Sequence, residues 1–551
     1  MKEKLAKSIE KALEALKAAG ELGDADIPEV QLAIPKQAEH GDYACNIAMM
    51  LAKKAGKNPR ELAGRIVETL GDGGGLIERT EIAGPGFLNF FLKSEGLFDV
   101  VKTIATQGEA FGRSDAGAGK RVMVEFVSAN PTGPLHVGHG RGAVIGDVLA
   151  NLLAAAGYAV HREYYINDAG VQMNNLGRST YLRYRQLIEG TSEPLPEGLY
   201  QGDYIVEYAK ELRAGRGDGI GEDAIGELTV FTATKILDMI RADLDRLGIR
   251  FDEWFSEKTL HDGGQVREKL DGLRARDLAY EKDGALWFRT EQFGDDKDRV
   301  LVKSGGEKTY LAADVAYHAN KIDRGFDELV DIWGADHHGY VARMKAAIQA
   351  LGKPPEMLTV MLIQMVNLVR GGERVSMSTR AGSFVTLREL VDEAGKDATR
   401  YFFLMRRYDS QLDFDVDLAK EKSNQNPVFY VQYMHARICS VFAKAAEEGV
   451  SIPDPTDVDF SLLTAPEEVQ IAQQLAELPN VIERAARDRE PHRLVTYIYD
   501  LASTFHPYYF QHRVITDDAA LTAARLALYA AIRQVTQNVL ALMGIDAPES
   551  M

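Results

Sequence analysis

The pattern of apolar and polar positions divides the chain into a mixed N-terminal part, an alternating central part and a helical C-terminal part. Apolar residues recur at spacings of four, four and three between residues 5 and 16 and stop before Gly20, which predicts an amphipathic helix. Residues 78–92 are typical of two strands joined by the Gly-Pro-Gly turn at 84–86. We therefore expect residues 1–110 to form a small α/β domain.

The central part alternates strand-like and helix-like segments. Apolar runs typical of strands occur at 122–127, 158–167, 328–336 and 357–369. A turn-rich loop and a helix ending at Gly157 separate the first two runs, and this strand-loop-helix-strand order is typical of a parallel sheet. The charged stretch 190–300 predicts an insertion within a sheet domain that spans 111–423.

Helical periodicity dominates residues 424–551, which predicts an all-α domain. We expect its helices to be interrupted at four prolines: Pro453, Pro455, Pro491 and Pro507. Its aromatic residues between 505 and 513, with Tyr497 and Tyr499, could stack on unpaired nucleic-acid bases. Helix-bundle core is the competing interpretation for most of them.

Composition narrows the class of protein. The chain has 551 residues, of which 45% are hydrophobic and 26% charged, as in ordinary globular domains. Its two cysteines, Cys45 and Cys439, match no zinc or redox spacing. No uninterrupted apolar run of about 18 residues exists, and the N-terminus resembles neither a signal nor a transit peptide, so we expect a cytoplasmic protein without membrane contact. The net charge of −18 argues against a nucleic-acid partner unless a local basic track exists.

The most informative chemistry lies where the first central strand gives way to its helix. His136 and His139 stand three residues apart, with Gly138 between them. A helix N-terminus binds anions, and two imidazoles there could donate hydrogen bonds to phosphate oxygens in a transition state. Two alternatives remain open. The histidines could simply cap the helix, or Gly138, Gly140 and Ala143 with Glu163 could form a nicotinamide dinucleotide fingerprint.

These residues resemble a known family. The sequence His-Val-Gly-His at 136–139 resembles the first signature of class I aminoacyl-tRNA synthetases, and Ser-Ala-Asn-Pro-Thr-Gly at 128–133 resembles the arginyl-tRNA synthetases. The resemblance covers essentially the whole chain. It implies a Rossmann-type catalytic domain with a parallel sheet and an insertion (111–423), a small α/β domain that contacts tRNA (1–110) and an all-α anticodon-binding domain (424–551).

The second class I signature departs from the family pattern. In the segment Ser-Met-Ser-Thr-Arg at 376–380, Met377 and Ser378 match, but both lysines are missing. Some arginyl enzymes instead carry a lysine just before the first signature, a position that is Gly133 here. The resemblance therefore implies that Mg²⁺ or an arginine (Arg370, Arg374 or Arg380) replaces that cation.

The resemblance also implies three groups of site residues. The catalytic group is His136, Gly138, His139, Met377, Ser378 and Arg380. The ATP-binding group is Asn130, Pro131, Thr132, Gly133, Pro134, Leu135, His136, Val137, Gly138, His139, Gly140, Gly334 and Asp336. The arginine-binding group is Glu125, Ser128, Asn130, His139, Tyr310, Asp314, His337 and His338. Tyr310 and Asp314, four residues apart on one helix face, would bind the guanidinium.

The implied function is arginine–tRNA ligase activity. Arginine would be activated with ATP and Mg²⁺ to arginyl-adenylate and transferred to the terminal ribose of the arginine tRNA. The expected partners are L-arginine and this tRNA, the expected state is a monomer, and we expect no resident metal, including zinc at Asp336, His337 and His338. Two alternatives stay open: a non-catalytic tRNA-binding relative, which would explain the missing lysines, and a nicotinamide-dependent oxidoreductase.

Overall fold

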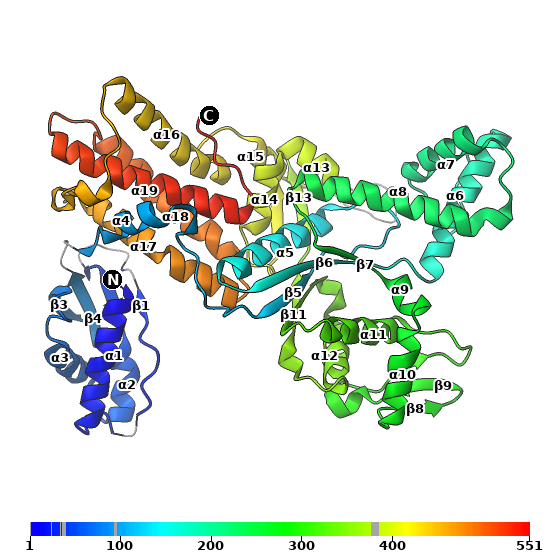
Figure 1. The fold of residues 1–551 in the computed structure, drawn as a ribbon, viewed down its shortest axis with the longest axis horizontal. Coiled ribbons are helices and arrows are strands. Elements are labelled where there is room, and N and C mark those ends of the chain that lie inside the picture. The colour runs from blue at the N-terminus through cyan, green and yellow to red at the C-terminus, as the bar shows by residue number, and fades with distance from the viewer. Residues whose placement is uncertain (1, 24, 34, 36–39, 93–95, 376–384) are drawn as a thin grey trace.

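The computed structural model describes residues 2–23, 25–33, 35, 40–92, 96–375 and 385–551, without the side chains of residues 2 and 3. Figure 1 shows an elongated molecule. The N-terminal unit and the C-terminal helices lie at one end, the parallel sheet lies near the middle, and a helical arm and a second lobe lie at the other end.

The N-terminal unit packs helices on one antiparallel sheet. Its helices are α1 (Lys2–Ala18), α2 (Ile47–Ala55) and α3 (Pro59–Leu70), and its strands are β1 (Leu32–Ala33), β2 (Tyr43–Cys45), β3 (Ile77–Ala83) and β4 (Phe87–Leu92), in the order β1-β2-β4-β3. The predicted turn at 84–86 joins β3 to β4. A Cβ at Gly86 would lie 2.9 Å from the Pro59 carbonyl oxygen, so the turn also sets how closely α3 approaches.

The central sheet is parallel throughout. Its strands are β12 (Leu358–Ile363), β11 (Glu328–Gly334), β5 (Arg121–Glu125), β6 (Ala159–Ile166) and β7 (Glu253–Ser256), in that spatial order. The chain runs from β5 outward through β6 and β7, then returns to fill the other side with β11 and β12. The carboxyl ends of β5 and β11 are therefore a topological switch point, where open α/β sheets bind ligands.

Helix α5 (Val137–Ala155) connects β5 to β6 and is buried along most of its length. A Cβ at Gly146 would lie 2.3 Å from the Phe126 ring, so glycine allows the helix to lie close to the end of β5. Arg141, fully buried on the same helix, donates to the carbonyl oxygens of Gln364, Arg407 and Ser410. This guanidinium fixes segments distant in sequence against the start of α5.

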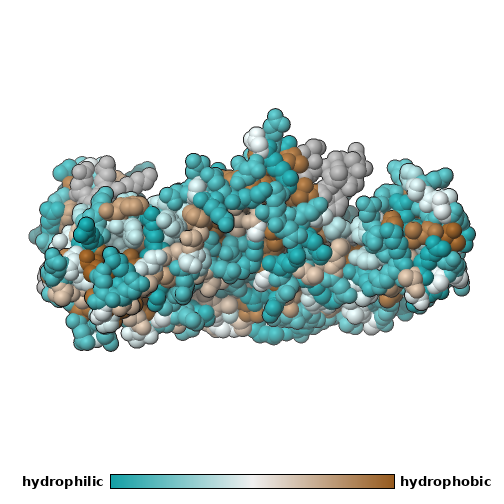
Figure 2. Space-filling model, turned by 90° about the horizontal axis from the view of Figure 1, so that it is seen from above, coloured by the Kyte–Doolittle hydropathy of each residue, from teal (hydrophilic) through white to brown (hydrophobic). Residues whose placement is uncertain are grey.

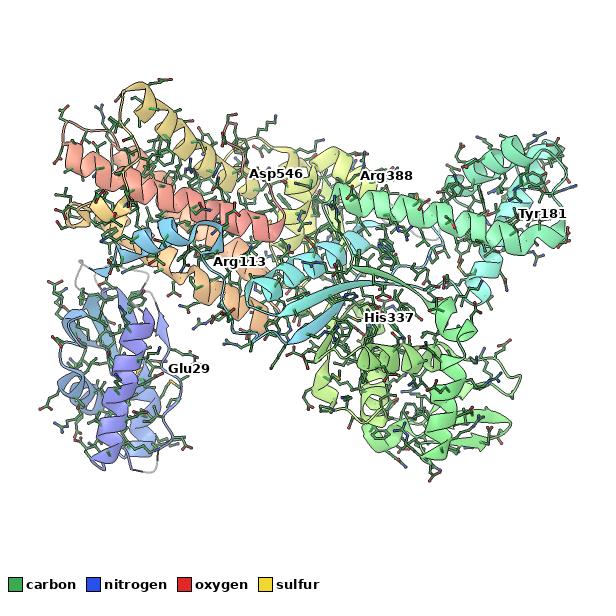
Figure 3. All side chains as sticks on the ribbon, in the orientation of Figure 1. Glu29, Arg113, Tyr181, His337, Arg388 and Asp546 are labelled. Atoms are coloured by element: carbon green, nitrogen blue, oxygen red, sulfur yellow. The ribbon has the colours of Figure 1, made fainter. Side chains whose placement is uncertain are left out.

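The stretch 190–300 is not one continuous insertion, because β7 returns to the central sheet within it. Before β7 the chain forms an arm of α6 (Val171–Glu189), α7 (Asp203–Arg216) and α8 (Ile225–Arg246). After β7 it forms a lobe of α9 (Glu257–Asp262), α10 (Gln265–Ala275), β8 (Ala279–Lys282), β9 (Ala285–Phe288) and β10 (Arg299–Val302). The lobe continues with α11 (Tyr310–Asp323) and α12 (Val341–Ala350). Arg388, labelled in Figure 3, pairs with Asp243 of α8 at 2.6 Å and ties the arm to the body.

A further small sheet links the catalytic part to the C-terminal helices. It contains β13 (Val366–Arg370), β14 (Glu373–Arg374) and β15 (Leu412–Asp415), accompanied by α13 (Leu387–Ala394), α14 (Lys396–Leu404) and α15 (Val416–Lys420). The apolar run at 357–369 is thus two strands in different sheets. The chain leaves β12 at Ile363 and begins β13 at Val366.

The C-terminal part is helical, as the periodicity predicts. It consists of α16 (Pro427–Glu447), α17 (Pro466–Arg487), α18 (His492–Gln511) and α19 (Ala519–Met543). Helix α4 (Asp99–Gln107) packs against α17 and α19, and Asn538 of α19 donates to the Gly108 and Phe111 carbonyl oxygens just after α4. The predicted interruption at Pro507 is wrong, because this proline lies inside α18. Its missing N–H leaves the Ser503 carbonyl at an exposed position, where water can satisfy it.

The face seen in Figure 2 is mostly hydrophilic, with apolar side chains in small groups. Among the residues that the structure describes, no helix is long and apolar enough to cross a membrane.

Candidate active site

A cavity of about 1170 Å³ opens at the carboxyl ends of the central strands. It lies at the switch point between β5 and β11, and Figure 3 places His337, one of its wall residues, just beneath the central sheet. It brings together many of the predicted residues: Glu125, Ser128, Asn130, His136, Gly138, His139, Tyr310, Asp314, Gly334, Asp336 and His337. One cavity therefore holds both the helix N-terminus and the acidic residues.

The two histidines are parts of the helix cap. The His136 Nδ1 accepts from the backbone N–H groups of Gly138 (3.1 Å) and His139 (3.4 Å), and the His139 Nδ1 accepts from the His136 N–H (3.3 Å). The rings stack with centroids 3.7 Å apart. A Cβ at Gly138 would lie 3.0 Å from the His136 ring, so glycine leaves room for this arrangement. The capping interpretation is thus confirmed, and it is compatible with a chemical role.

The cap also fixes which nitrogen of each ring carries the proton. Because Nδ1 of both rings accepts hydrogen bonds, the neutral rings carry hydrogen on Nε2. Burial lowers the pKa of His136, and burial together with the neighbouring His136 lowers the pKa of His139 to about 3. At neutral pH the pair therefore supplies two neutral N–H donors rather than cations. Such donors stabilise charge that develops on an oxygen without repelling each other.

The opposite part of the cavity is acidic. Asp314 is buried on α11, and burial raises its pKa to about 6 although the Tyr340 hydroxyl donates to it. Tyr310, one turn earlier on the same helix, is 62% exposed. The two residues line the same cavity from one helix, as their spacing predicts.

Glu257 is a wall residue that the sequence did not reveal. It lies at the start of α9, is only 6% exposed and influences Asp314 electrostatically. Residues 190–300 read as an insertion, and only the return of β7 to the sheet carries Glu257 to the site. Tyr165 on β6 and Tyr340 after β11 also line the cavity, and nothing in their local sequence separates them from core tyrosines.

Glu125 occupies the end of the central strand and is buried. Its Oε1 accepts from the Ser128 hydroxyl at 2.9 Å, and the Ser128 Oγ in turn accepts from the Tyr165 backbone N–H at 3.1 Å. The chain turns sharply here, with φ of 67° at Val127 and 40° at Ser128. A left-handed conformation is costly for a β-branched residue, and such strain is typical of functional sites.

Asn130 and the loop after β6 complete the wall. The Asn130 amide donates to the Gln172 side chain at 2.7 Å. Asp168 accepts from the Ser256 hydroxyl at 2.6 Å and from the Lys258 backbone N–H at 3.0 Å, so this loop is tied to the start of α9.

Other predicted residues do not line the cavity. They are Pro131, Thr132, Gly133, Pro134, Leu135, Val137, Gly140 and His338. The loop they begin contacts the arm, where the Tyr204 hydroxyl donates to the Thr132 carbonyl oxygen at 2.5 Å. Leu135, Val137 and Gly140 are buried, and a Cβ at Gly140 would lie 2.5 Å from Leu387. Their placement indicates that they hold the loop and helix in position.

Three predicted catalytic residues, Met377, Ser378 and Arg380, lie outside the described residues. The segment that follows them ends beside the first signature, because Thr386 forms a bridge with His136 and Leu387 donates to the Leu135 carbonyl oxygen at 2.8 Å. Two of the three predicted replacement cations, the pair on β13 and β14, form ion pairs. Arg370 lies 2.5 Å from Glu393, and Arg374 lies 3.2 Å from Asp413.

Glu163, the acidic residue of the alternative dinucleotide-binding pattern, is bound by other side chains of the protein. Glu163 is fully buried and accepts from Tyr317 (2.6 Å) while pairing with Arg324 (2.7 Å). Burial opposes its ionisation, but bonds from His161, Arg324 and Tyr317 lower its pKa to about 2. Its carboxylate is therefore committed to internal partners rather than to a ribose. The same Arg324 guanidinium contacts His161 and Glu253, the other members of this cluster.

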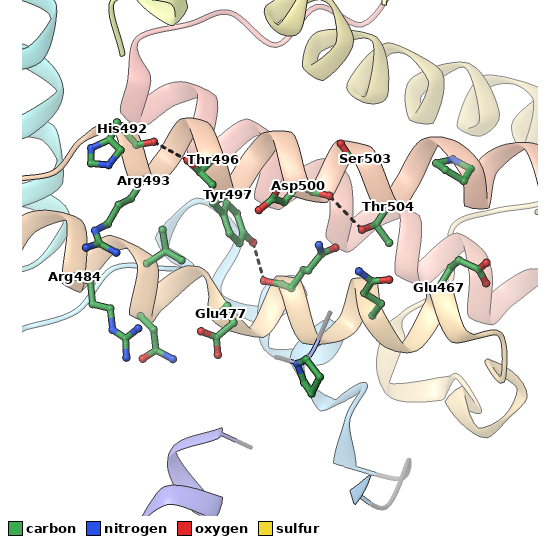
Figure 4. Close-up of a pocket in the computed structure, with 16 residues that line it drawn as sticks. Glu467, Glu477, Arg484, His492, Arg493, Thr496, Tyr497, Asp500, Ser503 and Thr504 are labelled. Atoms are coloured by element: carbon green, nitrogen blue, oxygen red, sulfur yellow. Dashed lines mark hydrogen bonds between the residues drawn. The ribbon is translucent and has the colours of Figure 1, made fainter. Parts of the chain in front are cut away.

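A second cavity of about 790 Å³ lies between α17 and α18 (Figure 4). Its wall mixes acids such as Glu467 and Asp500 with Arg484 and Arg493, and the Tyr497 hydroxyl donates across it to the Gln474 carbonyl oxygen at 3.0 Å. Among the described residues, its wall contains none that we predicted to bind ATP or arginine.

Comparison with known proteins agrees with this geometry. The model of the arginyl-tRNA synthetase N-terminal domain matches residues 3–92, the class I (R) tRNA synthetase catalytic domain matches 100–194 and 207–412, and the DALR anticodon-binding domain matches 431–551. Arginine–tRNA ligases of Syntrophotalea carbinolica and Citrifermentans bemidjiense are 51% and 50% identical, each over 100% of both chains. The Thermus thermophilus arginyl-tRNA synthetase structure shares the fold, with a TM-score of 0.76 and 24% identity over 99% of each chain.

Proposed function

The chain belongs to the arginyl-tRNA synthetase family and is an arginine–tRNA ligase, and we propose that the cavity at the switch point is where it activates arginine. The observation that carries this assignment is the pairing, in one cavity, of a helix N-terminus with two neutral histidine donors and a set of buried carboxylates. A phosphate fits the first feature, and a guanidinium fits the second.

Asp314 and Glu257 bind the guanidinium in this proposal. A guanidinium presents five N–H donors in one plane, so two carboxylates from different elements can bind it in a fork geometry. The Tyr340 hydroxyl holds Asp314 in place, and Tyr310 lies at the open side. Lysine, with one ammonium, would leave part of this acceptor set unpaired, which is a strong basis for rejection.

Glu125 binds the α-ammonium group in this proposal. Its carboxylate lies on the strand end that leads into the first signature, and its contact with Ser128 directs one oxygen to the cavity wall. Asn130 lies next along the same loop and would orient the carboxylate of arginine. The amino acid would thus run from the acidic end toward the N-terminus of α5.

ATP binds with its phosphates at the start of α5. A carboxylate oxygen of arginine attacks the α-phosphorus, the bond to the bridging oxygen breaks, and pyrophosphate leaves. His136 and His139 donate from Nε2 to phosphate oxygens as their charge grows. Asp336, exposed at the end of β11, would accept from ribose hydroxyls, and Mg²⁺ would enter with the triphosphate.

Transfer follows when a hydroxyl of the terminal tRNA ribose attacks the arginyl carbonyl carbon and AMP leaves. For tRNA binding, the C-terminal helices offer an aromatic surface around Arg437. Its guanidinium lies 4.2 Å from the Tyr433 ring centroid and 4.5 Å from that of Phe510, and Phe510 is 71% exposed. Phe505 and Tyr508 are core residues, so the sequence prediction of base stacking applies only to the exposed rings. We propose a monomer that acts in the cytoplasm.

The direct test is ATP-dependent attachment of each of the twenty amino acids to tRNA, with pyrophosphate exchange measured with and without tRNA. Charging by arginine alone is expected. Exchange that appears only with tRNA would show that tRNA completes the site. Light scattering of the purified chain tests the monomer. Charging by another amino acid, or tRNA binding without charging, would contradict the proposal.

A further inference from the structure

A row of buried ionic contacts extends from Glu125. The Lys321 Nζ, fully buried on α11, lies 2.5 Å from the Glu125 Oε2 and 2.8 Å from the Asp331 Oδ1. The other Asp331 oxygen faces the His318 Nε2 at 2.9 Å. Lys321 is not among the residues that line the cavity, so it reaches a substrate only through Glu125.

This cluster has one ammonium between two carboxylates. Burial raises the pKa of Glu125, and the positive charge of Lys321 is the largest influence that opposes this rise. Burial opposes the charge on Lys321 too, but Asp331 and Glu125 raise its pKa overall. The ammonium is therefore present at neutral pH. Without it, two carboxylates would share a buried space, and one of them would take up a proton.

The two oxygens of Glu125 have different partners. The Glu125 Oε2 accepts from the Lys321 ammonium, while the Oε1 accepts from the Ser128 hydroxyl at the cavity wall. Contacts on both oxygens hold the carboxylate in one rotamer. Lys321 thus acts on both the charge and the orientation of this group.

We propose that Lys321 is a positioning residue for the α-amino end of arginine, which holds Glu125 ionised and aligned toward the substrate. The inference rests on the proposed function, because it takes Glu125 as the partner of the α-ammonium. Asp331 and His318 complete the support. The His318 Nδ1 faces the Asp314 carbonyl oxygen, which can only accept, so that nitrogen carries a proton.

Titratable groups from several neighbouring elements interact electrostatically with Glu125. They are Lys321, His318, Asp314 and Tyr317 on α11, Asp331 on β11 and Tyr165 on β6. Glu163 on β6 acts on Tyr317, and Glu257 on α9 acts on Tyr165 and Asp314. Asp314 titrates near pH 6 in the same cavity. A pH profile alone would therefore mix two carboxylates, and the test needs a ligand that reports on the α-amino end.

The experiment compares arginine with 5-guanidinopentanoate, which is arginine without its α-amino group. The full-length variant Lys321→Met is assayed by pyrophosphate exchange with saturating ATP and tRNA, and the analogue is used as a competitive inhibitor. The KM for arginine should rise about tenfold or more at pH 7, because each unit of pKa above the assay pH lowers the ionised fraction tenfold. The preference for arginine over the analogue should fall by the same factor, while the KM for ATP stays unchanged.

The pH profile gives a second signature. The KM for arginine of Lys321→Met, divided by the wild-type KM at the same pH, should fall as the pH rises toward 9, since Glu125 then ionises without its ammonium. Lys303→Met is the matched control, because Lys303 is exposed and pairs with the exposed Glu307, and it should behave as the wild type. Equal weakening of arginine and the analogue, or an unchanged KM for arginine, would overturn the proposal.

Two further variants separate the possible failures. Asp331→Asn removes the competing carboxylate and keeps Lys321, so the preference for arginine should persist to lower pH even if Lys321→Met does not fold. Loss of the preference in Asp331→Asn overturns the inference. Glu125→Gln tests the premise. If it keeps the preference, the proposed role of Glu125 fails, and if it alone loses the preference, only the role of Lys321 fails.

Discussion

Replacing Asp314 with asparagine should stabilise the free protein at neutral pH while abolishing tight arginine binding. Burial raises the pKa of this carboxyl from 3.8 to about 6. A difference of about two pKa units corresponds to about 3 kcal/mol between the protonation states. The ionised carboxylate therefore lowers the stability of the empty protein by about this amount at pH 7. The asparagine side chain would keep an oxygen acceptor for the Tyr340 hydroxyl without the buried charge.

The sign of the pH dependence follows from the direction of the shift. A carboxyl whose pKa is raised on folding favours the folded state fully below the unfolded value near 3.8, and this contribution is lost as the pH rises through about 6. Asp314→Asn should therefore gain about 1–3 kcal/mol at pH 7 and almost nothing near pH 4, allowing for relaxation around the site.

Chemical unfolding without ligands at both pH values measures this gain. Asp323→Asn is the matched control, since that residue is exposed on the same helix and pairs with Lys269. Arginine should shift the unfolding midpoint of the wild type but not that of Asp314→Asn. An equal gain in unfolding free energy at both pH values, or no gain at pH 7, would refute this reasoning. It would mean that Asp314 carries no destabilising buried charge that a bound guanidinium could neutralise.

The remaining predictions concern the histidines, the second carboxylate and the tRNA surface. His136→Asn should keep the helix cap, because asparagine caps well, yet lose on the order of 10²- to 10³-fold in activation rate with the Nε2 donor; unchanged exchange activity would contradict the donor role. Glu257→Gln should raise the KM for arginine about tenfold or more with an unchanged KM for ATP, measured by exchange, and a normal arginine saturation curve would remove Glu257 from the pocket. Arg437→Ala should weaken tRNA binding in a filter assay without changing the KM for arginine. The control is Arg533→Ala, which removes a guanidinium stacked on Phe442 and should leave tRNA binding unchanged. Equal weakening by both variants would mean that the tRNA binds elsewhere.

Local sequence signals were sufficient to predict the strand and the helices that carry the first recognised residues of the site. The apolar run at 122–127, the histidines at the start of α5 and the spacing of Tyr310 and Asp314 are each recognised from residues close together in sequence. The fold class and the family followed from such signals, and both are confirmed. The prediction that Pro507 interrupts its helix failed because an exposed carbonyl can replace its lost bond with water.

Local patterns in the amino-acid sequence were enough to predict most of the strands and helices in order, the helix N-terminus with its histidines, and Asp314 as a carboxylate suited to a guanidinium. Which of these side chains lie together in the cavity depends on how the elements pack. Glu257 reaches the cavity because β7 joins the central sheet, and Lys321 acts on Glu125 across 196 positions of sequence because α11 packs against the end of β5. Periodicity reports the face that one element buries, whereas contacts between elements depend on strand order, which no local pattern encodes. The charge of Glu125 is likewise set by neighbours that only the packed structure supplies.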